Sequence, residues 1–160
     1  MHLAFRTSTV RKKLVREFAE KVRHKKILEV GSGPKSLSGY FDPSNYFLAS
    51  DIRPDLGYVV VDVTKMEFEE EFDVILCLNV LEHVFDFQLA IANLRRALRR
   101  GGTLVVACPT CYPLHDEPGD YWRFTEHALR RLLTGFEVVR LEHGGLRRLP
   151  FWHYVEAIKR

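Results

Sequence analysis

Glycines and carboxylates stand together at the ends of two short apolar segments. Glu29, Gly31 and Gly33 close the first segment, and Asp51 closes the second. Glycine permits a sharp backbone turn and the close approach of a ligand. A carboxylate about twenty residues beyond such a turn can accept hydrogen bonds from a ribose diol. The pattern therefore predicts a nucleoside pocket, although Asp51 can also cap an ordinary turn before Pro54.

A second group of reactive side chains follows later in the chain. His83 comes directly after a long apolar segment, and a neutral imidazole can accept a proton near pH 7. It can equally serve only to shape its loop. His115 and Asp120 lie in a loop rich in proline, where they can either line an acceptor pocket or hold the loop together. For Trp122 and Phe124, which follow that loop, we expect packing against the core.

The cysteine pattern argues against a metal or redox site. The chain has three cysteines, Cys77, Cys108 and Cys111, and an odd, scattered set is typical of a reducing compartment. The Cys108–Cys111 pair has the Cys-x-x-Cys spacing, but there is no second pair to complete a zinc site. We therefore expect no bound metal and a cytoplasmic location.

These residues need a scaffold, and the apolar periodicity predicts one of alternating strands and helices. An N-terminal helix follows from the spacing of Val10, Leu14, Phe18 and Val22, and Thr125 is a candidate helix cap. Gly101 and Gly102 are expected to end the helix before them. The expected strands are 27–30, 46–50, 58–61, 72–78, 103–107, 136–141 and 151–158, and the expected helices are 36–40, 87–100 and 125–133.

This order predicts an α/β fold, a Rossmann-like three-layer sandwich. The sheet should have seven strands and be mostly parallel, with an antiparallel C-terminal strand pair. Residues 1–160 are expected to form a single domain, with an N-terminal helix in residues 1–25 packed on it. No apolar run is long enough for a membrane span, and the first residues do not resemble a secretory signal.

Two segments resemble a known family. Glu29-x-Gly31-x-Gly33 is similar to motif I of the class I S-adenosylmethionine-dependent methyltransferases, commonly Glu/Asp-x-Gly-x-Gly-x-Gly, with Lys35 at the third glycine position. Residues 72–84 resemble the family segment Phe-Asp-x-Val-x-x-x-x-Val-Leu-Glu-His-Val, which is typical of its type-11-like small-molecule subgroup. The resemblance covers residues 27–108 well and the remainder loosely.

The resemblance implies a cofactor, S-adenosylmethionine, and its product S-adenosylhomocysteine. It implies that Asp51 binds the ribose, that Asp62 and Val63 face the adenine, and that Asn79 and Val80 line the methionine end. The residues expected to bind the cofactor are Glu29, Gly31, Ser32, Gly33, Asp51, Ile52, Asp62, Val63, Asn79, Val80 and Glu82.

The implied activity is direct in-line methyl transfer to a small-molecule or saccharide-like acceptor, by a monomer or homodimer. Alignment of the reactants can supply most of the rate enhancement, so a general base is optional. The candidates for such a base are His83 and His115. A nucleoside-binding protein without turnover remains open, because of Lys35 and the short crossover before residues 58–61. An RNA-directed enzyme also remains, although a net charge of +3 makes nucleic acid an unlikely partner. Its basic rim would comprise Arg130, Arg131, Arg140, Arg147 and Arg148.

Overall fold

The computed structural model describes residues 12–160. Val10, one residue of the expected first helix, lies outside the described residues. Residues 12–19 are helical, as the four-residue spacing predicted, but the helix ends before Val22, the last residue of that spacing. Leu14, Val15 and Ala19 of this helix are buried, and they share a core with Ile27 and Leu76 of the sheet.

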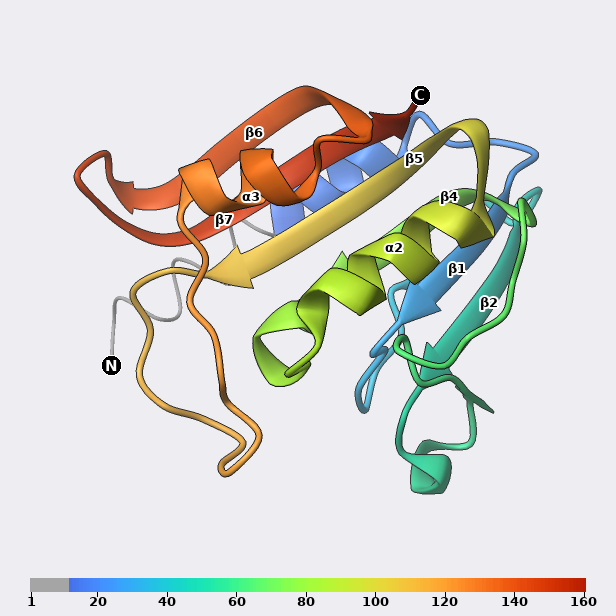
Figure 1. Ribbon diagram of the computed structural model, residues 1–160. Helices are drawn as coiled ribbons and strands as arrows, with labels where there is room; N and C mark the ends of the chain where they lie inside the picture. The colour runs from blue at the N-terminus through green and yellow to red at the C-terminus, as the bar shows by residue number, and fades with distance from the viewer. Residues whose placement is uncertain (1–11) are drawn as a thin grey trace.

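Seven strands of the described chain form one sheet, in the order β3-β2-β1-β4-β5-β7-β6 (Figure 1). Strands β1 to β5 pair in parallel, and β7 runs antiparallel to both β5 and β6. This confirms the predicted mostly parallel sheet with an antiparallel C-terminal pair. The strands are β1 (Lys26–Val30), β2 (Tyr46–Asp51), β3 (Val59–Val60), β4 (Phe72–Leu78), β5 (Leu98–Pro109), β6 (Phe136–Leu146) and β7 (Leu149–Lys159).

Helices cover both faces of the sheet. Helices α2 (Phe87–Ala97) and α3 (Glu126–Leu132) lie on the face toward the viewer in Figure 1, and the helix at residues 12–19 lies behind the sheet. Each face has its own buried apolar cluster. Because both faces are covered, β4 is apolar almost without interruption, as expected for a central parallel strand. Three short 3-10 turns complete the elements, namely η1 (Ser38–Tyr40), η2 (Pro54–Leu56) and η3 (Leu81–His83).

Helix α2 ends at Ala97, so the prediction that it continues to Arg100 is wrong. Leu98 already belongs to β5 and pairs with Phe72 of β4, while its N–H caps the helix by bonding to the Leu94 carbonyl. The next pair in the register is Val74 with Thr103, so residues 99–102 form an irregularity in the strand. Gly101, with φ at 75°, and Gly102 therefore permit this irregularity rather than end a helix.

The start of α3 agrees with the sequence. Thr125 is its N-cap, and the Thr125 hydroxyl accepts a hydrogen bond of 3.2 Å from the Ala128 N–H. Across residues 12–160, no helix is both long enough and apolar enough to cross a bilayer.

Candidate cofactor and acceptor site

The expected site residues gather at the carboxyl ends of the strands. Strand β1 lies between β2 and β4, so the chain reverses its direction of travel across the sheet at this point, and ligands of open α/β sheets bind there. A cavity of about 180 Å³ opens between the segment after β1 and the end of β4. Its lining residues are Lys12, Val15, Glu29, Val30, Gly31, Ser32, Lys35, Leu37, Leu78 and Asn79.

The two glycines after β1 serve different purposes. Both have positive φ, 67° at Gly31 and 63° at Gly33. A Cβ at Gly31 would lie 2.4 Å from Cγ2 of Val80, whereas a Cβ at Gly33 would have no atom within 4 Å. Gly31 therefore lets the turn pack against the segment after β4. Gly33 leaves open space in which a ligand can approach the backbone.

Glu29 stabilises the glycine turn through hydrogen bonds of its side chain. Its buried carboxylate accepts hydrogen bonds from the hydroxyls of Ser32 (2.8 Å) and Ser36 (2.6 Å), and from the Leu37 N–H (3.2 Å). Burial raises the pKa of Glu29, and these hydrogen bonds oppose the rise. These hydrogen-bond partners of Glu29 lie in the loop that follows it. Ser36, seven residues after Glu29, is part of the same network.

Asp51 connects the end of β2 to the glycine turn. Oδ2 of Asp51 accepts a 2.8 Å hydrogen bond from the Gly33 N–H, and Oδ1 accepts one of 3.0 Å from the Arg53 N–H. The bond from Arg53 shows that Asp51 also caps the turn before Pro54, the alternative that the sequence left open. Each carboxylate oxygen has two acceptor positions, so both can still accept from a ligand. The neighbouring Ile52 is 62% exposed, an apolar side chain beside this acid.

Asp62 and Val63 follow β3. Oδ1 of Asp62 accepts hydrogen bonds from the Thr64 hydroxyl (2.6 Å) and N–H (2.9 Å), which together with Lys65 lower the pKa of Asp62. Val63 is buried, and its carbonyl accepts a 3.0 Å bond from the Asn93 side chain of α2. Asn93 belongs to no motif, so its bond to Val63 could not be predicted from the sequence.

The segment after β4 turns sharply at Asn79, whose φ is 58°. Its N–H bonds to the Ala107 carbonyl of β5 at 2.8 Å, and the next residue, Val80, packs on Gly31. Glu82 is fully buried in η3. The structure thus brings the residues after β1, β2 and β4 to one edge of the sheet.

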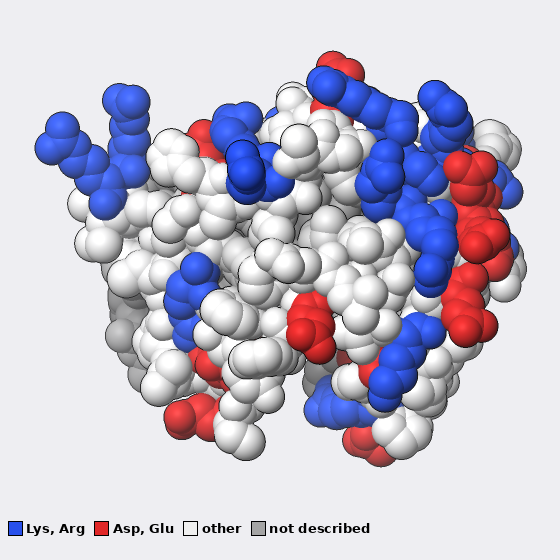
Figure 2. All heavy atoms as spheres, viewed as in Figure 1, with Lys and Arg blue, Asp and Glu red and all other residues white. Residues whose placement is uncertain are grey.

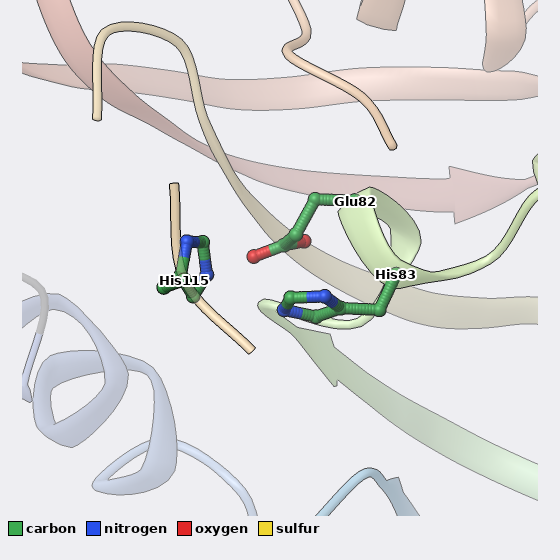
Figure 3. Close-up of side chains that lie close together, drawn as sticks. All are labelled: Glu82, His83 and His115. Carbon is green, nitrogen blue, oxygen red and sulfur yellow. The ribbon is translucent and has the colours of Figure 1, made fainter. Parts of the chain in front are cut away.

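The loop between β5 and α3 closes over η3. The Glu82 carbonyl accepts hydrogen bonds from the N–H groups of Tyr121 (2.8 Å) and Trp122 (3.1 Å). The rings of His83 and His115 meet edge to face with their centroids 4.9 Å apart. Figure 3 shows the side chains of Glu82, His83 and His115 turned toward one another. The two candidate catalytic histidines, 32 positions apart in the chain, are therefore neighbours.

Asp120 is the anchor of this loop. Its side chain is only 1% exposed and makes a two-pronged ion pair with Arg123, at 2.6 and 2.7 Å. Oδ2 of Asp120 also accepts a 2.9 Å bond from the His115 N–H and lies 3.2 Å from Nδ1 of that ring. The Arg123 guanidinium, together with the His115 contacts, holds the pKa of Asp120 well below its usual value.

The aromatic residues after Asp120 pack as the sequence predicted. Phe124 is buried, and the Trp122 indole N–H donates to the Phe85 carbonyl at 3.2 Å. Phe87 contacts the rings of both Trp122 and Phe124.

The three cysteines are free thiols. Cys108 is buried in β5, where burial raises its pKa, while Cys111 is exposed. The two cysteines of the Cys-x-x-Cys spacing thus lie in different environments.

A sheet of this order, with a glycine turn after β1 bonded to an acid at the end of β2, defines a nucleoside-binding α/β protein. The sequence matches the family described as methyltransferase domain over residues 28–106. The chain belongs to the class I S-adenosylmethionine-dependent methyltransferases.

Among curated proteins, the chain is similar to the tRNA U34 carboxymethyltransferase of Sulfurovum sp. (strain NBC37-1). The two are 36% identical over 128 residues, which cover 68% of this chain and 42% of that protein. The chain thus spans less than half the length of this relative.

Solved structures share the fold. The 1,6-didemethyltoxoflavin-N1-methyltransferase of Burkholderia thailandensis, with bound 1,6-didemethyltoxoflavin and S-adenosylhomocysteine, superposes with a TM-score of 0.72 at 20% identity, covering 92% of this chain and 77% of that one. Magnesium protoporphyrin IX methyltransferase from Synechocystis PCC 6803, with bound S-adenosylhomocysteine, gives 0.76 at 16% identity, covering 96% and 84%.

Proposed function

We propose that this chain transfers a methyl group from S-adenosylmethionine to an acceptor bound under the loop between β5 and α3. The observation that carries the proposal is the bond between the Gly33 N–H and Oδ2 of Asp51. It joins the glycine turn to the acid expected to bind ribose, at the edge of the sheet where α/β proteins bind ligands. Family membership supports the choice of cofactor.

The residues present fit that cofactor. The open space at Gly33 would admit a nucleoside against the backbone, and Asp51 retains acceptor positions for ribose hydroxyls. Exposed Ile52 offers an apolar surface for the adenine, and Asp62 and the Val63 N–H, which follow β3, are the groups expected to face its ring. The methionine end would lie in the cavity lined by Glu29, Gly31, Ser32 and Asn79, close to Val80 and Glu82.

Lys12 and Lys35 also line this cavity. An ammonium group beside a bound amino acid attracts its carboxylate. Lys35, which departs from the family's usual glycine, would then contribute to binding the methionine portion instead of weakening the turn.

When bound, S-adenosylmethionine supplies an electrophilic methyl group on a good leaving group. The chain's own task is to align an acceptor for in-line displacement, and alignment alone can contribute about 7–11 kcal/mol. The loop that packs its backbone on Glu82 would exclude water from the acceptor position. His115, oriented by Asp120, and His83, oriented by the Gly119 carbonyl, are the groups positioned to hold a proton there.

A small acceptor suits the surroundings of this loop. A cavity of about 420 Å³ lies beside it, lined by Phe85, Asp86, Phe87, Gln88, Leu89 and Trp122. Aromatic walls with a few polar groups are typical of sites for small ring-shaped molecules, saccharides included. This favours the small-molecule acceptor over a large polyanion.

An RNA acceptor is the second candidate, and one observation favours it. The similar Sulfurovum protein is named a tRNA U34 carboxymethyltransferase. Against it, the expected basic rim is partly engaged in ion pairs, because Arg130 lies 3.0 Å from Glu126 and Arg140 lies 3.0 Å from Glu17. In Figure 2, many of the Lys and Arg side chains on the viewed face gather at the upper right, away from the carboxyl ends of the strands, and acidic groups lie among them.

Calorimetry with S-adenosylhomocysteine tests the pocket. We expect Asp51→Ala to weaken binding at least about tenfold, since it removes charged hydrogen-bond acceptors each contributing about 1.5–3 kcal/mol. Asp55→Ala, in the adjacent turn η2, is the matched control and should bind like the wild type. Equal affinity in wild type and Asp51→Ala would reject the assignment.

A methyl-transfer assay with candidate acceptors then separates an enzyme from a nucleoside-binding protein without turnover.

A further inference from the structure

We propose that Glu82, His83 and His115 bind a divalent transition-metal ion of the zinc class. Each of the three residues offers one ligand atom, and these atoms all lie within 4.8 Å of one another. A tetrahedral zinc ion with bonds of about 2.0–2.2 Å holds its ligands roughly 3.4 Å apart, so side-chain rotations of about an ångström would close the site. Figure 3 shows the three side chains converging from η3 and from the loop after β5.

The hydrogen bonds of His83 prepare it to be a ligand. Its Nδ1 lies 2.9 Å from the Gly119 carbonyl, which can only accept, so Nδ1 carries the proton. Nε2 of a neutral His83 then presents its lone pair. A ligand histidine in metal sites commonly donates its other ring N–H to a backbone carbonyl or carboxylate in this way.

His115 is prepared in the same manner. Its Nδ1 lies 3.2 Å from the Pro113 carbonyl and 3.2 Å from Oδ2 of Asp120. Both partners are acceptors, so the proton again resides on Nδ1 and Nε2 is left as the ligand atom. Asp120 is fixed by Arg123, which gives the carboxylate–histidine arrangement that supports metal ligands in other proteins.

Glu82 supplies a negative charge within the cluster. It is fully buried, and a buried carboxylate is stabilised by a cation close to it. Two imidazoles and one carboxylate suit zinc, iron, cobalt or nickel, whereas magnesium and calcium prefer oxygen ligands alone. Asp116, 83% exposed, has Oδ2 at 4.0 Å from Nε2 of His83, so a second carboxylate stands beside the site.

Three protein ligands leave a position for water or for an oxygen atom of the acceptor. A divalent ion there would lower the pKa of a bound hydroxyl and orient it, in place of a proton transfer to Nε2 of His83 or His115. This consequence rests on the proposed function, whereas binding of the ion does not. The expectation of no bound metal rested on the Cys-x-x-Cys spacing alone, and those cysteines take no part in this cluster.

Cobalt titration of the untagged protein tests the site, because four-coordinate Co²⁺ absorbs strongly in the visible. We expect saturation at one ion per chain. His115→Ala and His83→Ala should abolish the spectrum, and Asp120→Asn should weaken affinity about 10–100-fold. His143→Ala is the control. His143 forms a different histidine pair with His153, with ring centroids 6.4 Å apart, so this variant removes an imidazole outside the proposed site. It should titrate like the wild type.

Two results would overturn the inference: no visible spectrum in the wild type, or a spectrum that survives in His115→Ala. Binding of S-adenosylhomocysteine, measured on the same samples, keeps the two proposals separate. A variant that binds the nucleoside but not cobalt is folded and has lost only the metal site. A wild type that binds cobalt but not the nucleoside would contradict the proposed function alone.

Discussion

The carboxylates at the carboxyl ends of β1 and β2 form hydrogen bonds with residues of the neighbouring loops. Glu29 binds hydroxyls and an N–H of the segment after it, and Asp51 binds the N–H of Gly33. Such bonds fix the path of a loop before a ligand arrives, which reduces the cost of ordering it on binding. Lys35 is different, because it is exposed and lines the cavity.

Lys35→Ala should therefore weaken the binding of only those ligands that carry a carboxylate for Lys35 to contact. We expect a two- to fivefold loss of affinity for S-adenosylhomocysteine, in line with about 0.5–1 kcal/mol for an exposed ion pair. Methylthioadenosine, which lacks the amino-acid portion, should bind wild type and Lys35→Ala equally. Calorimetry with both ligands measures this, with Lys25→Ala as a control at the opposite edge of the sheet. An equal loss for both ligands would contradict a carboxylate contact.

The lowered pKa of Asp120 makes a prediction about acid stability. Its folded-state pKa lies well below the unfolded value of about 3.9, so ionised Asp120 stabilises the fold at every pH above that value. The contribution is lost as the pH falls below about 4 toward the folded pKa. Urea unfolding should show wild type more stable than Asp120→Asn by a constant amount from pH 7 to 5, with the difference shrinking below pH 4. Asp55→Asn should show no such pH-dependent difference.

Sequence reasoning succeeded at this scale where a residue's neighbours are close in the chain. Asp51 and the glycines could be placed because Asp51 ends one apolar segment and the glycines follow another. The Ser36–Glu29 bond and the position of Lys35 depend on the path of a loop, and the pairing of His83 with His115 depends on two strands lying side by side. None of these three features leaves a local pattern in the sequence.

At the scale of elements, the glycine turn after β1 must pass close to the segment after β4. Gly31→Ala should destabilise the fold by about 1–3 kcal/mol, because it combines a positive φ with a contact on Val80. Gly33→Ala has nearly the same φ but open space around its Cβ, so it should cost only the backbone strain. Denaturant unfolding of both variants measures the difference. Equal losses would mean that the approach of Val80 does not matter.

The presence of the strands was predictable, but the end of α2 and the full lengths of β5, β6 and β7, which extend beyond the expected 103–107, 136–141 and 151–158, were not. Apolar runs such as Phe72–Leu78 have lengths and boundaries that match the observed strand. The residues 98–100 have good helix propensity, but pairing of Leu98 with Phe72 outweighs it. Tertiary pairing of this kind cannot be read from a local window.

At the scale of the whole molecule, the fold brings together segments that the sequence separates. The order β1-β4-β5 places the ends of these three strands next to one another, so the glycine turn, η3 and the loop before α3 share one edge. The predicted seven-stranded topology was enough to foresee this meeting of loops. It did not foresee the convergence of Glu82, His83 and His115, because that depends on how the loop folds back.

The charge distribution of the molecule yields the last prediction. The net charge is +3, and Arg140, one of the expected basic rim, pairs with Glu17, Glu142 and Glu156. Pairing with carboxylates reduces the capacity of Arg140 to neutralise phosphates. Fluorescence titration with a tRNA fragment that contains U34 should give weak binding, and log K against log salt should have a slope of about −2 or shallower, which corresponds to two or three phosphate contacts. Neutralising the exposed turn between β6 and β7, by Arg147→Ala with Arg148→Ala, should reduce that slope further. A slope of about −5 or steeper in the wild type, made shallower by about 2 in the double variant, would instead favour RNA as the acceptor.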